Sequence, residues 1–195
     1  MYRNIYIERN RIVYKSLREI QNREKGHISI LCFPTFQKDF GISFYKMKSH
    51  SGWIKNTILK VTEDEFSKDS FKISLYIKRE TGILQKTVFE EIESKIKNTP
   101  FPKSQVFGEG GRDGTVYELN LNSAIKITLN WWSANLDKNS DWEVINKTVS
   151  EIVEQVKDLE AEESKEFLYI YEENTYTDNV TGGSRLMTHT EIKPQ

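Results

Sequence analysis

The stretch Gly108–Trp132 constrains the fold most, because it contains two alternating segments separated by a short polar break. Apolar residues occupy every second position in both segments: Tyr117, Leu119 and Leu121, then Ile125, Ile127, Leu129 and Trp131. Alternation with a period of two, in residues of high strand propensity, is typical of half-buried β-strands. The sequence therefore predicts a β-hairpin with one apolar face.

The pairing of this hairpin follows from its pattern. Pairing Leu119 with Ile127 puts both apolar sets on one face, whereas a slip of one residue would separate them. We expect Leu119 and Ile127 to be buried cross-strand neighbours, and the hairpin to form the centre of the sheet. Asn120 then lies on the opposite, wetter face.

A helix is predicted after the hairpin. Ser140-Asp141-Trp142-Glu143 fits a capping box, in which the Ser140 side chain accepts a hydrogen bond from the Glu143 backbone N–H. Apolar residues then recur at helical spacing: Trp142, Ile145, Val149, Ile152, Val153, Val156 and Leu159. An amphipathic helix of this kind covers the apolar face of a sheet.

Similar patterns predict the remaining elements. Helices are expected at residues 10–25 and 82–98, strands at 1–7, 27–33, 40–47, 71–79 and 166–171, and either state at 53–61. Residues 99–103 are a candidate joint, and the polar tail 174–195 is either loose or adds an edge strand. We expect residues 1–195 to form a single α+β domain, in which two or three helices pack on one face of a mainly antiparallel sheet.

Several features bear on the compartment. No apolar run approaches the roughly 20 residues that span a bilayer, and the first residues lack the apolar core of a signal peptide. Cys32 is the only cysteine, so no internal disulfide can form. These features predict a cytoplasmic protein that does not enter a membrane.

Charge is unevenly distributed along the chain. Residues 1–60 carry 12 Lys or Arg and 4 Asp or Glu, whereas residues 151–173 carry 9 acids and 2 lysines. Such polarity can steer partners, but two solvated faces of one domain also explain it. Arg11, Lys15 and Arg18 form a short basic stripe with glutamates beside it, which argues against nucleic acid as the partner.

No catalytic, metal or cofactor site is predicted. His27, His50 and His189 lack metal-ligand spacing, and Cys32 lies in an apolar run typical of a buried thiol. The turn Gly108–Gly114 can hold an anion through its backbone N–H groups and Arg112. A strand rather than a helix follows it, so it matches no phosphate-binding loop, and a structural turn is favoured.

Protein-binding residues are the remaining candidates. An acidic surface is expected around Glu160, Glu162, Glu163 and Glu166. Trp131 and Trp132 point to opposite faces of a strand, so one belongs to the core. Trp132 and Trp142 are candidate aromatic anchors, although a tryptophan beneath a loop is the simpler interpretation.

The segment from Asp113 through Leu119, the strand that ends in Trp131-Trp132, and the amphipathic helix together resemble small uncharacterised bacterial proteins, some of immunity-protein type. The resemblance covers roughly residues 107–159, and Ser133-Ala134-Asn135 stands where that pattern often has a proline. It implies no catalytic residues.

Three functions are therefore considered. The first is a non-enzymatic binding protein, such as an immunity protein that neutralises a toxin by direct contact. The second is an enzyme with a site near Gly108–Gly114, and the third is an accessory subunit of a phage or secretion system.

Overall fold

The computed structural model describes residues 5–24, 26–34, 37–46, 53–67, 72–102, 114–122, 126–134, 136–138, 140–157, 159–177 and 184–194. They form three helices, α1 (Ile5–Glu24), α2 (Lys86–Asn98) and α3 (Asp141–Val156). The eight strands are β1 (Ile28–Pro34), β2 (Phe40–Lys46), β3 (Trp53–Ser67), β4 (Lys72–Gln85), β5 (Thr115–Asn122), β6 (Lys126–Trp132), β7 (Glu163–Thr177) and β8 (Ser184–Pro194).

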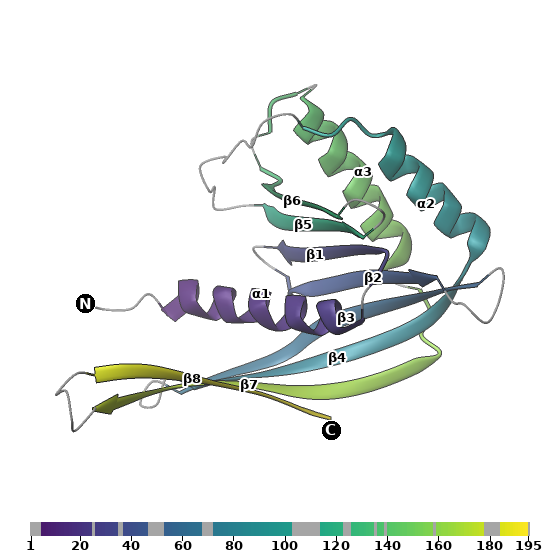
Figure 1. Cartoon of the computed structure of the whole chain (residues 1–195). Helices are drawn as coiled ribbons and strands as arrows, with labels where there is room; N and C mark the ends of the chain where they lie inside the picture. Colours follow the sequence, from purple (N-terminus) through teal and green to yellow (C-terminus); the bar gives the residue numbers. More distant parts are fainter. Residues whose placement is uncertain are drawn as a thin grey trace.

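All eight strands belong to one antiparallel sheet, in the order β6-β5-β1-β2-β3-β4-β7-β8. Strands β1 to β4 form a meander in chain order. The hairpin β5–β6 is added beside β1, and the hairpin β7–β8 is added beside β4 (Figure 1). The expected α+β class and antiparallel sheet are confirmed.

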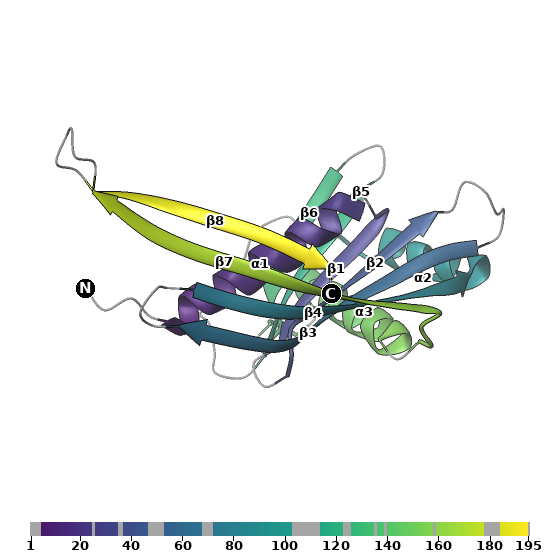
Figure 2. The same ribbon diagram turned by 90° about the horizontal axis from the view of Figure 1, so that it is seen from below.

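Both faces of the sheet are covered, so the expectation that the helices share one face is wrong. Helix α1 lies on one side and α2 and α3 on the other (Figures 1 and 2). The α1-side core contains Ile12, Val13, Leu17, Ile20, Leu31, Leu59, Val61, Ile73, Leu75, Ile77, Tyr169 and Tyr171. On the opposite side, α2 and α3 pack on residues such as Ile30, Phe44 and Leu119.

Strand β1 shows why this happens. Ile30 faces α2 and α3 while its neighbour Leu31 faces α1, and both are fully buried. Successive strand residues point to opposite faces, so a strand between two helical layers is apolar at nearly every position. The continuous run of Ile30, Leu31 and Cys32 meets that requirement.

The hairpin β5–β6 lies at one edge of the sheet, not at its centre. The paired residues also differ from expectation by two positions, since Leu119 pairs with Leu129 and Leu121 with Ile127. A shift of two residues keeps the same side chains on the same face. Leu119 is fully buried beneath α3 as expected, but Ile127 is half-exposed.

The local prediction for α3 is confirmed. Ser140 caps the helix, and its Oγ accepts a hydrogen bond from the Glu143 backbone N–H at 3.1 Å. The buried residues of α3 are Trp142, Ile145, Val149, Ile152, Val153 and Val156. Every one of them belongs to the predicted apolar stripe.

The limits of several other elements differ from the predicted ones. Helix α1 begins at Ile5, where a strand was expected, and residues 82–85 extend β4 rather than beginning α2. The tail is not loose where it is described, because β7 runs to Thr177 and β8 adds an edge strand. At the candidate joint, Thr99 is buried and its Oγ1 donates to the Lys95 carbonyl at 2.7 Å.

Candidate functional site

The acidic segment, defined as residues 160–166, connects α3 to β7 and forms the start of that strand. Glu160, Glu162, Glu163 and Glu166 are all exposed. The backbone N–H of Glu162 donates to the Thr81 carbonyl at 2.8 Å, which fixes the segment beside the end of β4. The glutamates are therefore presented from a segment anchored to the sheet.

The four glutamates do not form one patch. In the register of β4 and β7, Glu163 lies opposite Thr81 and Glu166 lies opposite Lys78. The two glutamates are three residues apart on β7, so they point to opposite faces of the strand. Glu163 also makes an ion pair with Lys165 at 2.5 Å. Among the described residues, no ion pair is found for Glu160, Glu162 or Glu166, but Glu166 lies opposite Lys78 and interacts with it electrostatically. Glu160 and Glu162 therefore carry most of the uncompensated charge of the segment.

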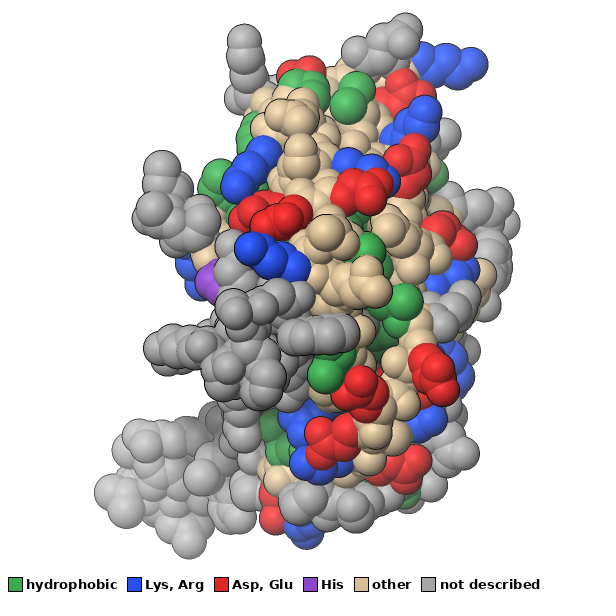
Figure 3. Space-filling view, turned by 90° about the vertical axis from the view of Figure 1, so that its right-hand side faces the viewer, with side chains coloured by type: hydrophobic (Ala, Val, Ile, Leu, Met, Phe, Trp, Pro, Cys, Tyr) green, Lys and Arg blue, Asp and Glu red, His purple; other side chains and the backbone are tan. Residues whose placement is uncertain are grey.

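On the face of Glu166, basic residues offset the acids. Lys60 and Lys78 contact the Glu80 carboxylate at 2.7 and 2.8 Å, and these hydrogen bonds lower the pKa of Glu80. Figure 3, which faces the right-hand side of Figure 1, shows acidic and basic side chains interleaved, with the hydrophobic ones in small groups. This face is a mixed surface rather than an acidic one.

The acidic segment has an exposed apolar neighbour. Ile83 is 41% exposed and lies two residues beyond Thr81 on β4, so it shares a sheet face with Thr81 and Glu163. An exposed aliphatic side chain near exposed charged residues is a combination found at protein interfaces, where an apolar contact is bordered by charges.

The two tryptophan candidates have different surroundings. Trp142 is only 7% exposed and its ring lies 6.2 Å from that of Trp131, so its assignment as a surface anchor is wrong. Trp131 stacks on Tyr117 at 5.3 Å and its Nε1 donates to Asn146 Oδ1 at 2.9 Å. Both tryptophans fasten α3 to the hairpin.

Trp132 is half-buried on the other face of β6. A Cβ atom at Gly114 would lie 2.9 Å from Cε2 and Cζ2 of its ring, so Gly114 passes directly over the indole. The Nε1 atom is buried and has no hydrogen-bond partner among the residues that the structure describes. Trp132 is thus packed against backbone, which favours the interpretation of a tryptophan beneath a loop. Arg112 and residues 108–113 lie outside the described residues.

A buried polar cluster lies between α1 and β5, and the sequence alone does not predict it. The Glu118 carboxylate is fully buried, and Tyr14 donates a hydrogen bond to its Oε2. Asn120 Nδ2 donates to Oε1 at 2.6 Å, and Arg18 Nε lies 3.6 Å from that oxygen. Thr128 Oγ1 completes the cluster by donating to Asn120 Oδ1 at 2.7 Å.

The surroundings of this cluster define what it can do. Burial first, and then the hydrogen bond to Glu118, raise the pKa of Tyr14 to about 12, so this hydroxyl remains a donor at neutral pH. Because Glu118 is inaccessible and already accepts from Tyr14 and Asn120, no substrate can reach it. The hydrogen bonds of this cluster therefore link α1 to the hairpin.

The sequence indicates some residues of this cluster but not that they lie together. Glu118 stands out as an acid between apolar strand residues, and Arg18 belongs to the basic stripe. Tyr14 and Glu118 are separated by 104 positions, so only the topology brings them together. Of the basic stripe, Arg11, Lys15 and Arg18 are exposed, but Lys15 and Arg18 lie 5.6 Å from the rings of Tyr171 and Tyr14.

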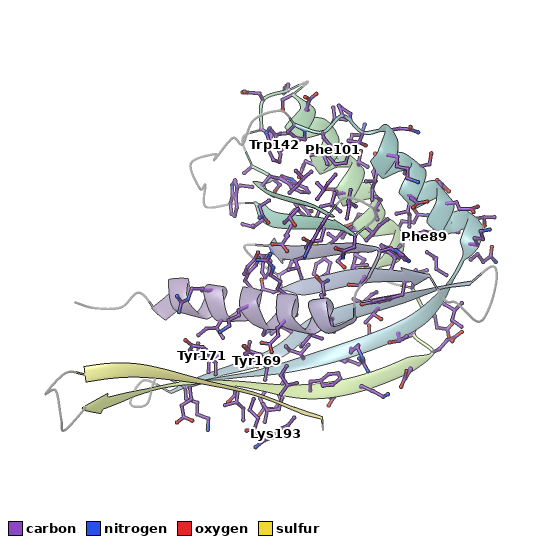
Figure 4. The ribbon with its side chains drawn as sticks, in the orientation of Figure 1. Phe89, Phe101, Trp142, Tyr169, Tyr171 and Lys193 are labelled. Atoms are coloured by element: carbon purple, nitrogen blue, oxygen red, sulfur yellow. The ribbon has the colours of Figure 1, made fainter. Side chains whose placement is uncertain are left out.

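Two further exposed apolar residues lie near the α2–α3 contact. Phe101 is 36% and Val144 39% exposed. Thr99 and Thr148 join the helices through hydroxyls 3.1 Å apart, and Thr148 Oγ1 donates to the Val144 carbonyl. Figure 4 shows Phe101 at the same end of α3 as Trp142. Sequence alone did not identify either residue as exposed.

Cys32 is 1% exposed, and burial raises the pKa of its thiol, which makes it a poor nucleophile. Within the described ranges, no three His, Cys, Asp or Glu side chains gather where they could hold a metal ion. None of the described helices has the length and apolar character needed to cross a membrane. Comparison of the chain with protein-family models, with curated proteins and with solved structures gives no match.

Proposed function

We propose that this is a cytoplasmic, non-enzymatic binding protein whose partner is a protein with a basic surface, and that it acts as an immunity protein by occluding a toxin. One observation carries the proposal. Glu160 and Glu162 are exposed on a segment whose backbone is anchored to Thr81, two residues from exposed Ile83. Uncompensated charge of one sign steers the approach of an oppositely charged partner, and an apolar neighbour adds contact area.

Charge reversal tests the surface. The variant with both Glu160→Lys and Glu162→Lys should bind the partner about tenfold more weakly, mainly through a slower association rate. The matched control reverses Glu90 and Glu91, which are exposed on α2 and lie 3.4 Å from Lys86 and Lys95. This control changes the net charge equally but should leave the affinity unchanged.

The partner is sought among the products of neighbouring genes. Each product is co-expressed with the protein, and both complex formation and growth rescue are measured. A stable complex that restores growth is the expected result. If no neighbouring product is toxic, or if a toxic product is neither bound nor neutralised, the immunity role is wrong. Equal loss of affinity in both charge-reversal variants would instead show that the acidic segment is not the contact.

A further inference from the structure

Strand β6 is an edge strand. Its hydrogen bonds to β5 show which of its backbone groups face the sheet and which face outward. Ser133 N donates to the Thr115 carbonyl at 2.9 Å, so the backbone of Ser133 points toward β5. Antiparallel strands alternate in this respect, so the backbones of Leu129 and Ile127 also point toward β5. The N–H and C=O groups of Thr128 and Asn130 then point away from the sheet, where the described residues contribute no further strand.

The two edges of the sheet differ in their protection. Strand β8 carries charged residues and ends in a proline; these residues are Arg185, Glu191, Lys193 and Pro194. Charges and proline are the features by which proteins prevent an edge strand from pairing with another chain. The interior of β6, from Ile127 to Trp131, has neither a charge nor a proline, and no bulge interrupts its pairing with β5.

The sequence of β6 is also complementary to itself. When two copies run antiparallel about a two-fold axis at Leu129, Ile127 lies opposite the partner's Trp131 and Thr128 opposite the partner's Asn130. Apolar residues then meet on the α3 side of the sheet, and a hydroxyl meets an amide on the α1 side. Lys126, which is exposed, lies opposite the partner's Trp132, a pairing of a cation with an aromatic ring.

We infer that two copies of this chain associate through β6, forming one continuous sheet across a two-fold axis at Leu129. The half-exposed side chains of Ile127 and Leu129 are covered in this arrangement, and the outward backbone groups of Thr128 and Asn130 gain partners. The acidic segment lies beside β4 and β7, far along the strand order from β6, so each copy keeps its own.

A cysteine scan of β6 tests the register directly. In this arrangement residue 129 and its copy form a pair without mutual backbone hydrogen bonds, with Cα atoms about 4.5 Å apart, which suits a disulfide. Leu129→Cys should therefore give a covalent dimer on mild oxidation. Ile127→Cys is the matched control, because its copy lies four residues along the strand, about 14 Å away. It should remain largely monomeric on a denaturing gel.

The mass of the protein in solution is the second measurement. Light scattering and sedimentation should give twice the chain mass of 22.9 kDa for the wild type. Asn130→Pro removes an outward N–H, which an edge strand tolerates, and should give a folded monomer by circular dichroism. Asn130→Ala keeps that N–H and should remain dimeric. A monomeric wild type, or a dimer in which Leu129→Cys forms no disulfide, would overturn the inference.

Discussion

Individual residues show how closely parts of this fold approach one another. Gly114 lies over the Trp132 ring, and Gly41 lies where a Cβ atom would be 2.7 Å from Gln21 Nε2. Gln21 in turn donates to the carbonyls of Ile30 and Ile42, at 3.3 and 3.2 Å. Both glycines thus leave space that a neighbouring side chain occupies.

Gly114→Ala should destabilise the fold by about 1–3 kcal/mol, because the new methyl group overlaps the indole and only strain can relieve it. Urea denaturation measures the loss. The same substitution in a Trp132→Leu background should cost clearly less, because the overlapping atoms are gone. Equal costs in the two backgrounds would mean that Gly114 does not contact Trp132 in solution.

Tyr14→Phe tests the hydrogen bond from α1 to Glu118 on β5. The change keeps the ring beside Phe33 but deprives the buried Glu118 carboxylate of a donor, which should cost about 1–3 kcal/mol at neutral pH. Denaturant midpoints give this number. Asn98→Ala, which removes an exposed side chain that bonds the Ser94 hydroxyl, should have little effect.

The pH dependence of the same variant has a defined sign. Tyr14 has a pKa of about 12 in the folded protein and an ordinary value of 10.0, so only the folded chain holds this proton between those values. Its contribution to stability is complete below pH 10 and is lost as the pH rises toward 12. The wild type should lose stability more steeply than Tyr14→Phe above pH 10. Parallel pH profiles would contradict this assignment.

Elements differ in how much of them could be predicted from sequence. Helix α3 was predicted closely because its cap and its stripe are local, and both act within a few residues. The sequence predicts that β5 and β6 form a hairpin, but it does not predict their register. A shift of two residues leaves every side chain on the same face, so the alternation fits both registers. The pairing of Leu119 with Leu129 depends on the connection between the strands, whose length the alternation does not determine.

The position of α1 was missed for a different reason. Its apolar stripe was recognised, but a stripe does not specify which sheet face it covers. The unbroken apolar run of β1 indicates burial on both faces, although its residues do not alternate between apolar and polar. The Glu118 cluster depended on the same missing information, because Tyr14 reaches it only from the α1 side.

Burial within the hairpin predicts a clear ranking of substitutions. Leu119→Ala should cost about 2–5 kcal/mol, because the side chain is fully buried and its loss leaves a cavity. Ile127→Ala, on the half-exposed edge strand, should cost less than half as much in the monomeric Asn130→Pro background. Equal shifts of the denaturant midpoint would place Ile127 in the core and contradict the observed register.

At the scale of the whole molecule, the two helical layers carry different charge. Helix α1 contains five Lys or Arg and three acids, whereas α3 contains four acids and one lysine. Part of the uneven distribution in the sequence therefore falls on opposite sides of one sheet. This arrangement agrees with the simpler explanation of two solvated faces, and it leaves the acidic segment as the more specific candidate.

Amide hydrogen exchange should reveal a gradient across the sheet. Strands β1 and β2, which lie inside the strand order and are buried on both faces, should exchange slowest, and β8 should exchange faster. The N–H groups of Thr128 and Asn130 should become protected as the protein concentration rises, since the inferred dimer covers them. Uniform protection across the sheet would contradict the gradient.

The division of the core between two faces also has a consequence for synthesis. Ten of the twelve residues of the α1-side core lie before residue 78, and only Tyr169 and Tyr171 come later, beneath α1 in Figure 4. The opposite core needs residues as late as Val156. Domains fold as their residues leave the ribosome, and contacts between distant segments form late. The nascent chain can therefore assemble α1 on its meander first, and the growing polypeptide then adds a hairpin to each flank of an existing sheet.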